Sequence, residues 1–213
     1  MEAIKNVRIE NRIAKPILTI EQAKHLILFL KDNRKYIWHY RDYALIYLMI
    51  TTGLRSVEAR RARIKDLRMI EGKHILYIQG KGRSSADEFV KISEGLHEAI
   101  TEYLMKRKDQ NPYLFVSRSK RSKKPLTRTI FMSILKRILS DSGLEDTHIT
   151  AHSLRHTAAS LNLERGGSLE ETQRLLRHKD MANTLVYAHT IEDVNDETVA
   201  RLEDFILGDE NKL

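Results

Sequence analysis

Hydrophobic residues recur at helical spacing in the first third of the chain. The segment TIEQ forms a capping box that begins at Thr19, and apolar residues at i, i+3 and i+4 spacing follow it, which predicts a first helix. Residues 43–50 (YALIYLMI) are apolar on every side and predict a buried helix that ends at Gly53. A third helix is predicted to begin near Ser56.

The pattern changes to alternating positions between residues 74 and 93. Residues 74–79 (HILYIQ) and 88–93 (EFVKIS) alternate apolar and polar side chains, and residues 80–87 (GKGRSSAD) between them are polar and contain two glycines. This arrangement predicts a β-hairpin with a long cationic tip. Residues 113–117 (YLFVS) predict one more short strand.

Helical spacing returns after the hairpin and dominates the rest of the chain. A second capping box, S-x-x-E, begins at Ser168, directly after two glycines that end the preceding helix. The sequence therefore predicts a mainly α fold with a small antiparallel β-sheet. We expect a lead-in over residues 1–18, one folded domain over 19–190, and a C-terminal helix and tail over 191–213. The further helices are predicted over residues 93–108, 130–139, 154–161, 168–178, 180–187 and 199–206.

The composition excludes cysteine chemistry and is typical of a folded protein without a membrane-spanning helix. The chain has 213 residues, 41% of them hydrophobic, which is enough for a real core. It has no cysteine, which excludes disulfides, thiolate metal sites and cysteine nucleophiles. The longest apolar run, residues 43–50, is far shorter than the roughly 20 residues of a membrane-spanning helix, and the charged N-terminus lacks a signal peptide. We therefore expect a cytoplasmic protein.

The charge balance points to an anionic partner. The net charge is +8 and the sequence pI is near 9.6, which favours nucleic acid or an acidic membrane surface as partner.

Residues 151–160 (AHSLRHTAAS) carry two histidines and an arginine at the predicted start of a helix. His152 and His156 have the i, i+4 spacing of a zinc-binding pair, but position 153 is Ser rather than the catalytic glutamate of such a motif, and Arg155 would repel a cation. The N–H groups of a helix N-terminus and a planar guanidinium both suit a phosphate. We therefore favour a phosphate site over a metal site here, and we expect no metal and no cofactor.

Five segments in order give the chain a family resemblance. They are TTGLRSVEARRARIKDL at 51–67, GKG at 80–82, H-x-x-R-H at 152–156, LLRH at 175–178 and VYAH at 186–189. Together they resemble the catalytic domain of the tyrosine recombinases, the phage-integrase family, over about residues 15–207. The resemblance implies the fold of that DNA breaking-rejoining domain and a site-specific recombinase, such as one that integrates or excises a mobile element.

The resemblance also implies a role for each matching residue. Arg55 and Arg155 would hold the non-bridging oxygens of a scissile DNA phosphate, and Tyr187 would attack phosphorus to give a 3′-phosphotyrosyl intermediate. Glu58 would support Arg55. Lys81 would protonate the leaving 5′-oxygen, His152 would assist proton transfer at the tyrosine, and His178 would hydrogen-bond the phosphate. The family usually has glycine where this chain has Arg177, which puts bulk and positive charge near the site.

Double-stranded DNA would be the partner, with a tetramer assembled on it and accessory DNA-bending proteins at some sites, near the nucleoid. The C-terminal segment would dock on a neighbouring protomer. A type IB topoisomerase and a non-catalytic DNA-binding module are the alternatives. The basic residues expected to contact backbone phosphates are Arg83, Arg118, Lys120, Arg121, Lys123, Lys124 and Arg128.

Overall fold

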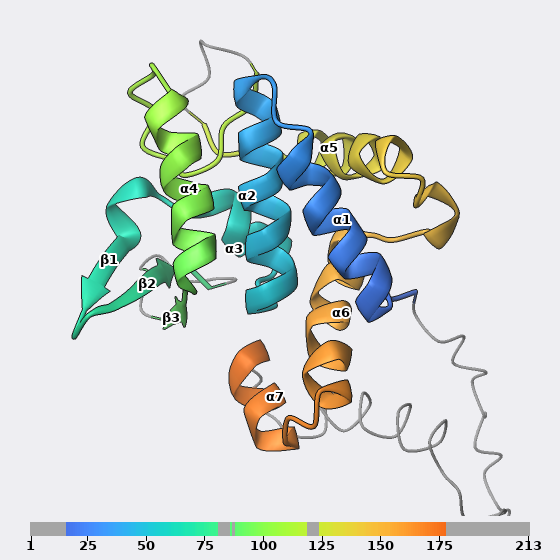
Figure 1. Cartoon of the computed structure of the whole chain (residues 1–213). Coiled ribbons are helices and arrows are strands. Elements are labelled where there is room, and N and C mark those ends of the chain that lie inside the picture. Colours follow the sequence, from blue (N-terminus) through green and yellow to red (C-terminus); the bar gives the residue numbers. More distant parts are fainter. Residues whose placement is uncertain (1–15, 81–85, 87, 119–123, 178–213) are drawn as a thin grey trace, which may run out of the picture.

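The computed structural model describes residues 16–80, 86, 88–118 and 124–177, and these form a mainly helical unit with one small sheet (Figure 1). This arrangement confirms the predicted mainly α fold with a small antiparallel sheet. Short 3-10 turns connect some of the elements. The elements are α1 (Ile20–Asp32), α2 (Ile37–Thr52), α3 (Ser56–Arg61), η1 (Ile64–Asp66), β1 (Leu67–Ile70), β2 (Lys73–Ile78), β3 (Glu88–Lys91), α4 (Glu94–Lys106), α5 (Arg128–Asp141), η2 (Glu145–Thr147), α6 (Ala151–Glu164) and α7 (Leu169–Leu176).

Helix α2 is the centre of the core. It lies between α4 and α1 in Figure 1 and also packs against α6. Its residues from Arg41 to Ile50 are buried apart from Tyr47, as expected for a helix that is apolar on every side. The helix begins at Ile37, six residues before the apolar run, and ends with Gly53 in the left-handed conformation (φ 59°).

Side-chain caps fix the starts of the other long helices. Thr19 and Ser168 each form the predicted capping box, in which a hydroxyl and a carboxamide or carboxylate satisfy backbone N–H groups at the helix start. The residue before the first cap, Leu18, is fully buried, and its N–H donates to Thr157 Oγ1 at 3.0 Å. The end of the expected lead-in is therefore fixed against α6.

The sheet has the order β1-β2-β3 and is antiparallel throughout. Strands β2 and β3 are the predicted hairpin. Strand β1 was not predicted, because three of its four side chains are exposed and it lacks the alternating pattern. It joins β2 through Glu71 and Gly72, which both have positive φ (48° and 71°), as a tight two-residue hairpin requires.

The prediction of a strand over residues 113–117 was wrong. Tyr113 makes only an isolated bridge to Arg63, and Leu114 N–H donates to the Ala62 carbonyl at 2.7 Å. The apolar run instead places Leu114 and Phe115 in the core as fully buried side chains. A short apolar run buries its side chains in a connecting segment as well as in a strand, so this pattern alone does not distinguish them.

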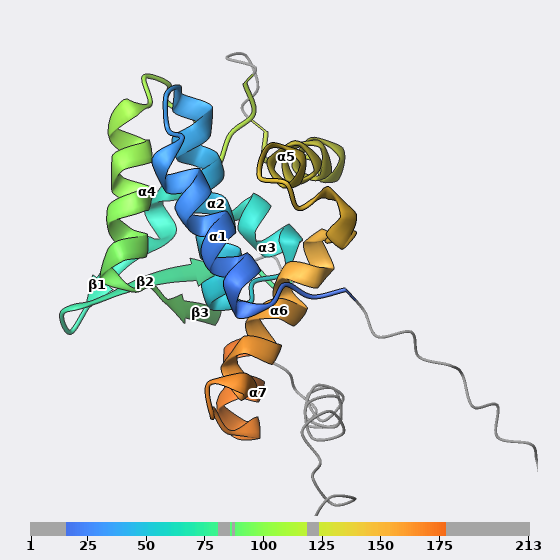
Figure 2. The same ribbon diagram turned by 45° about the vertical axis from the view of Figure 1, so that its right-hand side comes forward.

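Helix α6 packs against α2, and α7 lies at the end of α6 that points away from α5 (Figures 1 and 2). Both ribbon views show α7 beside the C-terminal part of α6 (Figures 1 and 2), and the two helices pack against each other. Helix α7 ends at Leu176, two residues before the predicted end at residue 178, because Arg177 takes the left-handed conformation.

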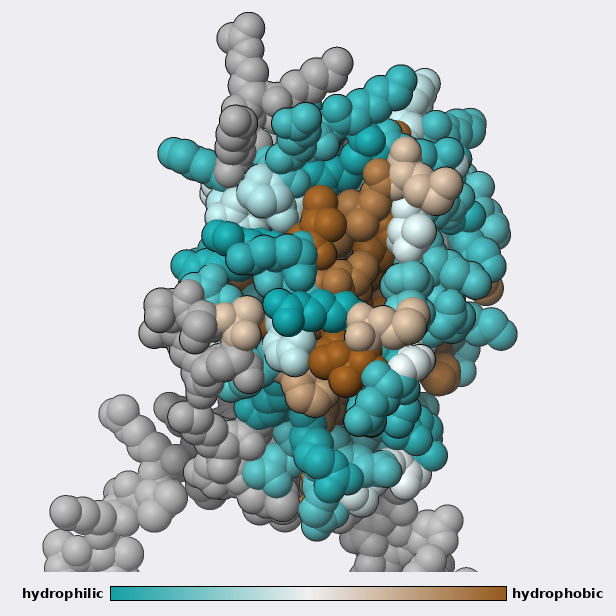
Figure 3. All heavy atoms as spheres, turned by 90° about the vertical axis from the view of Figure 1, so that its left-hand side faces the viewer, coloured by the Kyte–Doolittle hydropathy of each residue, from teal (hydrophilic) through white to brown (hydrophobic). Residues whose placement is uncertain are grey.

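The face that carries α4 and the sheet has a hydrophobic band bordered by hydrophilic side chains (Figure 3). Among the exposed apolar residues of these elements are Met69 on β1, Phe89 on β3 and Met105 on α4. No helix in the described part of the chain is both long and apolar enough to cross a membrane.

Candidate active site

Arg55 lies at the start of α3, where Glu58 holds both its backbone and its side chain. Its backbone N–H donates to Glu58 Oε2 at 2.8 Å, and its Nη1 donates to Glu58 Oε1 at 2.9 Å. Glu58 is fully buried, whereas the Arg55 side chain is 38% exposed. The carboxylate therefore orients the guanidinium while leaving part of it exposed.

Arg155 lies in the second turn of α6 and is only 3% exposed. Its Nη1 donates to the Gly53 carbonyl and its Nη2 to the Leu176 carbonyl, each at 2.5 Å. Gly53 closes α2 two residues before Arg55, and Leu176 is the last residue of α7. Arg155 thus binds the ends of two helices and brings its positive charge to the segment that carries Arg55.

A glycine is required where α2 turns into this segment. Gly53 has φ 59°, and a Cβ atom there would lie 2.8 Å from Leu176 Cδ2. The left-handed backbone strains a side chain at this position, and the close approach of α7 means that Leu176 would have to shift to admit one.

Arg177 is the departure from the glycine that the resembled family has, and it pairs with the supporting acid. It adopts φ 53°, and its Nη2 donates to Glu58 Oε2 at 2.7 Å. Its Nε lies 3.6 Å from Glu88 Oε2 on β3. Burial lowers the pKa of Arg177. The negative charge of Glu58 raises this pKa, and the positive charge of Arg55 lowers it further. Glu58 is therefore the shared anion of two arginines.

These four residues, Arg55, Glu58, Arg155 and Arg177, form what we call the arginine corner. It joins α3, α6 and α7 to the end of α2: Arg55 and Arg177 share one buried carboxylate, and Arg155 donates to the backbone carbonyls of Gly53 and Leu176. The net positive charge of the corner suits an anion such as a phosphate group, and the fixed orientation of Arg55 reduces the cost of binding it.

His152 lies in the first turn of α6, on the surface. Its ring makes an edge contact with His156, with centroids 4.1 Å apart and planes at 84°. Thr150 caps the helix by accepting from Ser153 N–H at 3.2 Å. The preference for a phosphate site over a metal site at these two histidines stays a prediction.

Seven of the residues that the sequence singled out lie outside the described residues. Two of them are the expected nucleophile and the histidine before it, and the others belong to the hairpin tip and the basic loop. They are Lys81, Arg83, Lys120, Arg121, Lys123, His178 and Tyr187.

The described members of the basic group lie on the surface near the starts of α2 and α5. Arg118 is exposed, and its guanidinium carbon lies 4.1 Å from the centre of the Trp38 ring. Lys124 is exposed, and Arg128 is the exposed first residue of α5. Contact with the Trp38 face holds the Arg118 cation in place without neutralising it.

One arginine of this surface was not identified from the sequence as a contact residue. Arg60 on α3 donates from Nη1 to the Leu126 carbonyl at 2.7 Å, which ties the segment before α5 to the helix that begins at Arg55. Burial lowers the pKa of Arg60, and the charges of Arg61 and Arg128 act in the same direction. The sequence shows several arginines after Glu58, but it does not indicate which of them packs against the segment before α5.

Comparison with known proteins gives consistent matches. A sequence model of the phage integrase family matches residues 16–193. The tyrosine recombinase XerA of Pyrococcus furiosus is 31% identical over 211 residues, covering 98% of this chain and 70% of that protein. XerD of Listeria innocua is 31% identical over 156 residues, covering 70% of this chain and 50% of that protein.

Solved structures agree in fold. The XerH site-specific recombinase bound to its difH substrate, in a pre-cleavage complex, matches 85% of this chain and 52% of that chain, with a TM-score of 0.69 and 25% identity. The catalytic domain of bacteriophage HP1 integrase matches 85% of this chain and 95% of that chain, with a TM-score of 0.54 and 18% identity. The chain thus spans about half the length of the XerD and XerH proteins that it matches.

Proposed function

The chain belongs to the phage integrase family of tyrosine recombinases, and from this premise we propose that it cuts and rejoins double-stranded DNA in site-specific recombination. The observation that carries the proposal is the arginine corner. Arg155 donates to the carbonyl two residues before Arg55, and Glu58 orients Arg55 with two hydrogen bonds. This contact supports the proposal, because it ties Arg155 to the segment that carries Arg55 although the two residues are far apart in the sequence.

In the proposed reaction Tyr187 Oη attacks the scissile phosphorus. A phosphorus–oxygen bond to the tyrosine forms, and the bond to the 5′-oxygen breaks. The phenol proton passes to His152, and Lys81 gives a proton to the leaving 5′-oxygen. Because the phosphotyrosyl ester keeps the energy of the phosphodiester bond, a free 5′-hydroxyl can reverse the step and join a new strand without a nucleotide cofactor.

The arginines contribute by stabilising charge. A phenol with a pKa near 10 is ionised only about one part in a thousand at pH 7, so the nucleophile needs a base or a positive field. Arg55 would contact the non-bridging oxygens directly, since its side chain is partly exposed. Arg155 would act from a buried position through its charge, with His178 donating a further hydrogen bond. Preorganised donors of this kind are typically worth about 3–4 kcal/mol each in the transition state.

The partner in this proposal is duplex DNA, bound through its phosphates. Exposed Arg118, Lys124 and Arg128 supply cations outside the arginine corner, and phosphate contacts of this kind position a protein without reading sequence. A tetramer on DNA, in which the C-terminal segment docks on a neighbouring protomer, would couple cleavage to strand exchange. The protein would then work at the nucleoid.

A suicide DNA substrate tests the chemistry. The protein is incubated in EDTA with a nicked duplex that carries its cognate site, selected from a random library by binding. We expect a covalent protein–DNA adduct that Tyr187→Phe abolishes. Tyr77→Phe is the matched control, because it removes a phenolic hydroxyl from β2 in the sheet, and it should give the wild-type amount of adduct.

Two outcomes would contradict the proposal. A protein that binds the selected DNA without forming an adduct is a DNA-binding module. An adduct that leads to relaxation of supercoiled DNA, but never to strand exchange between two sites, indicates a topoisomerase.

A further inference from the structure

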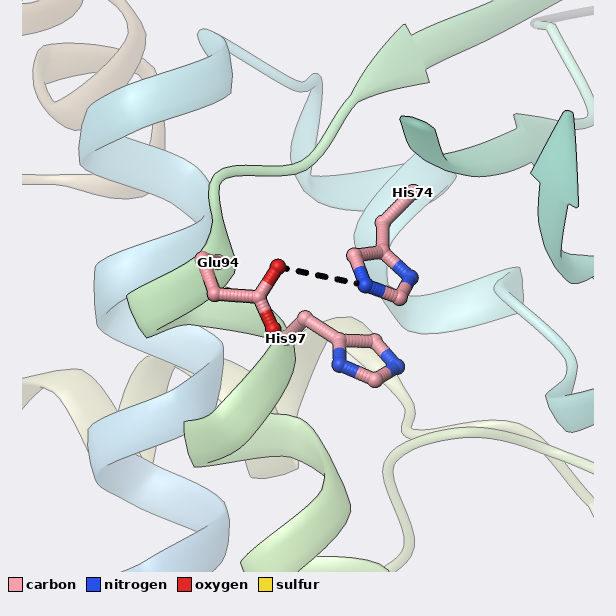
Figure 4. A group of neighbouring side chains, drawn as sticks. All are labelled: His74, Glu94 and His97. Carbon is pink, nitrogen blue, oxygen red and sulfur yellow. Dashed lines mark ion pairs between the residues drawn. The ribbon is translucent and has the colours of Figure 1, made fainter. Parts of the chain in front are cut away.

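Three potential metal ligands meet between the sheet and α4, away from the arginine corner. They are His74 on β2 and Glu94 and His97 in the first turn of α4, and we call them the histidine cluster (Figure 4). His74 Nε2 lies 3.3 Å from Glu94 Oε2. One ring nitrogen of each histidine and one carboxylate oxygen all lie within 4.8 Å of one another. No other such group of three occurs in the part of the chain that the structure describes.

The ligand chemistry of the histidine cluster suits zinc. Two imidazoles and one carboxylate are a common zinc ligand set, and a water molecule completes the tetrahedron. With metal–ligand distances of about 2.0–2.2 Å, tetrahedral ligands lie about 3.3 Å apart. The contact between His74 and Glu94 already has this separation. The remaining ligand atoms need to approach by at most about 1.5 Å, which is the difference between 4.8 Å and that value.

Most of this adjustment falls to Glu94, because its side chain is the exposed one. The Glu94 side chain is 71% exposed. The two imidazole rings are stacked, with centroids 3.5 Å apart and planes at 11°, so they must tilt before both lone pairs point to one ion. His74 and His97 are both partly buried, which limits the rotamers that they exchange.

We propose that His74, Glu94 and His97 bind a Zn²⁺ ion that links strand β2 to the start of helix α4. The Glu94 carboxylate would offset part of the charge of the ion, and a water molecule would occupy its fourth coordination position. It would join a side chain of the sheet to a helix that packs on the central helix α2. The site is independent of the proposed DNA cleavage, because none of its three residues belongs to the arginine corner.

Zinc binding to the full chain, freed of any histidine tag, tests this proposal. Isothermal titration with zinc sulfate, with metal analysis after dialysis, should give one ion per chain. Free zinc at a hundredfold excess over its Kd should raise the Tm by about 5 °C or more. Glu94→Gln and His97→Gln should each weaken zinc binding at least about tenfold and remove most of this rise.

Glu98→Gln is the matched control, because it removes an exposed carboxylate from the next position of the same helix. It should keep the wild-type affinity. Circular dichroism of each metal-free variant checks that it is folded. Equal zinc affinity in all variants would mean that the ion binds elsewhere, for example at His152 and His156, and would overturn the proposal. Failure of the wild-type protein to bind zinc would overturn it too, whatever the DNA adduct assay shows.

Discussion

The arginine corner and the histidine cluster both bring ionisable side chains together, but the acid is buried in the first and exposed in the second. In the arginine corner the shared acid is fully buried, and its partners come from positions up to 119 residues away. In the histidine cluster the acid is 71% exposed, and its partners lie on an adjacent strand and on its own helix. The first arrangement is closed by the protein itself, whereas the second is open to solvent and to a ligand.

The comparison of Glu58 with Glu94 shows how burial changes the cost of losing a partner in an ion pair. Removing water from Glu58 makes each of its contacts strong and also makes their loss expensive, since a buried charge without a partner is strongly destabilising. In the pair between His74 and Glu94 the acid is 71% exposed, so water can replace His74 as its partner at little cost. The proposed catalytic role of the arginine corner therefore depends on a fixed arrangement, whereas the proposed ion site of the histidine cluster depends on an acid that is free to move.

Replacing Glu58 should have the largest effect. Glu58→Gln leaves Arg55 and Arg177 without their shared anion, and we expect a loss of about 3–5 kcal/mol in the free energy of unfolding. Urea denaturation followed by circular dichroism measures this value. The exposed Glu164→Gln, at the end of α6, is the control and should change stability by less than about 0.5 kcal/mol. Equal effects at the two positions would show that the arginine corner is not a closed unit.

The close approach of α7 to α2 gives the next largest effect. Gly53→Ala forces a Cβ into a left-handed conformation and to within 2.8 Å of Leu176 Cδ2. We expect a loss of about 2–3 kcal/mol, of which about 1–2 kcal/mol is the backbone cost alone. Gly143→Ala isolates that cost, because Gly143 has φ 70° and no neighbouring atom lies within 4 Å of the position that its Cβ would take. Urea denaturation of both variants should therefore show Gly53→Ala to be the more damaging.

The left-handed backbone at Arg177 destabilises the protein, whereas its contact with Glu58 stabilises it. Two substitutions separate these effects. Arg177→Ala removes the contact with Glu58 but keeps a side chain at φ 53°, whereas Arg177→Gly removes the contact and relieves the backbone. We expect the glycine variant to be more stable than the alanine variant by about 1 kcal/mol in the same denaturation measurement. Identical stabilities would mean that the left-handed conformation at this position is lost with the guanidinium.

The sequence predicted the parts of the fold that local rules determine. The capping boxes at Thr19 and Ser168 give helix starts directly, since each cap is made within four residues. Strand β1 was missed because exposed side chains leave no periodic signal, and residues 113–117 were wrongly taken as a strand because burial, rather than pairing, explains their apolar character.

The same distinction holds for the arginine corner. The family resemblance implied that Glu58 supports Arg55, and the two side chains are in contact three residues apart on one helical turn. The contact between Arg177 and Glu58 joins α7 to α3, so only the tertiary fold brings it about. Arg177 therefore stood out in the sequence only as a residue in the place of a glycine, and its partner could not be read from local spacing.

Replacing Glu94 in the metal-free protein should have the smallest effect and provides the direct contrast with Glu58. Glu94→Gln makes the same chemical change at an acid that is 71% exposed and contacts His74 at 3.3 Å. We expect a loss of less than about 1 kcal/mol, which comes from an ion pair with an exposed acid and from a weak interaction with the N-terminus of α4. Urea denaturation in EDTA measures it beside Glu58→Gln. A loss as large as that of Glu58→Gln would mean that the histidine cluster is already a closed structural unit, with no place for an added ion.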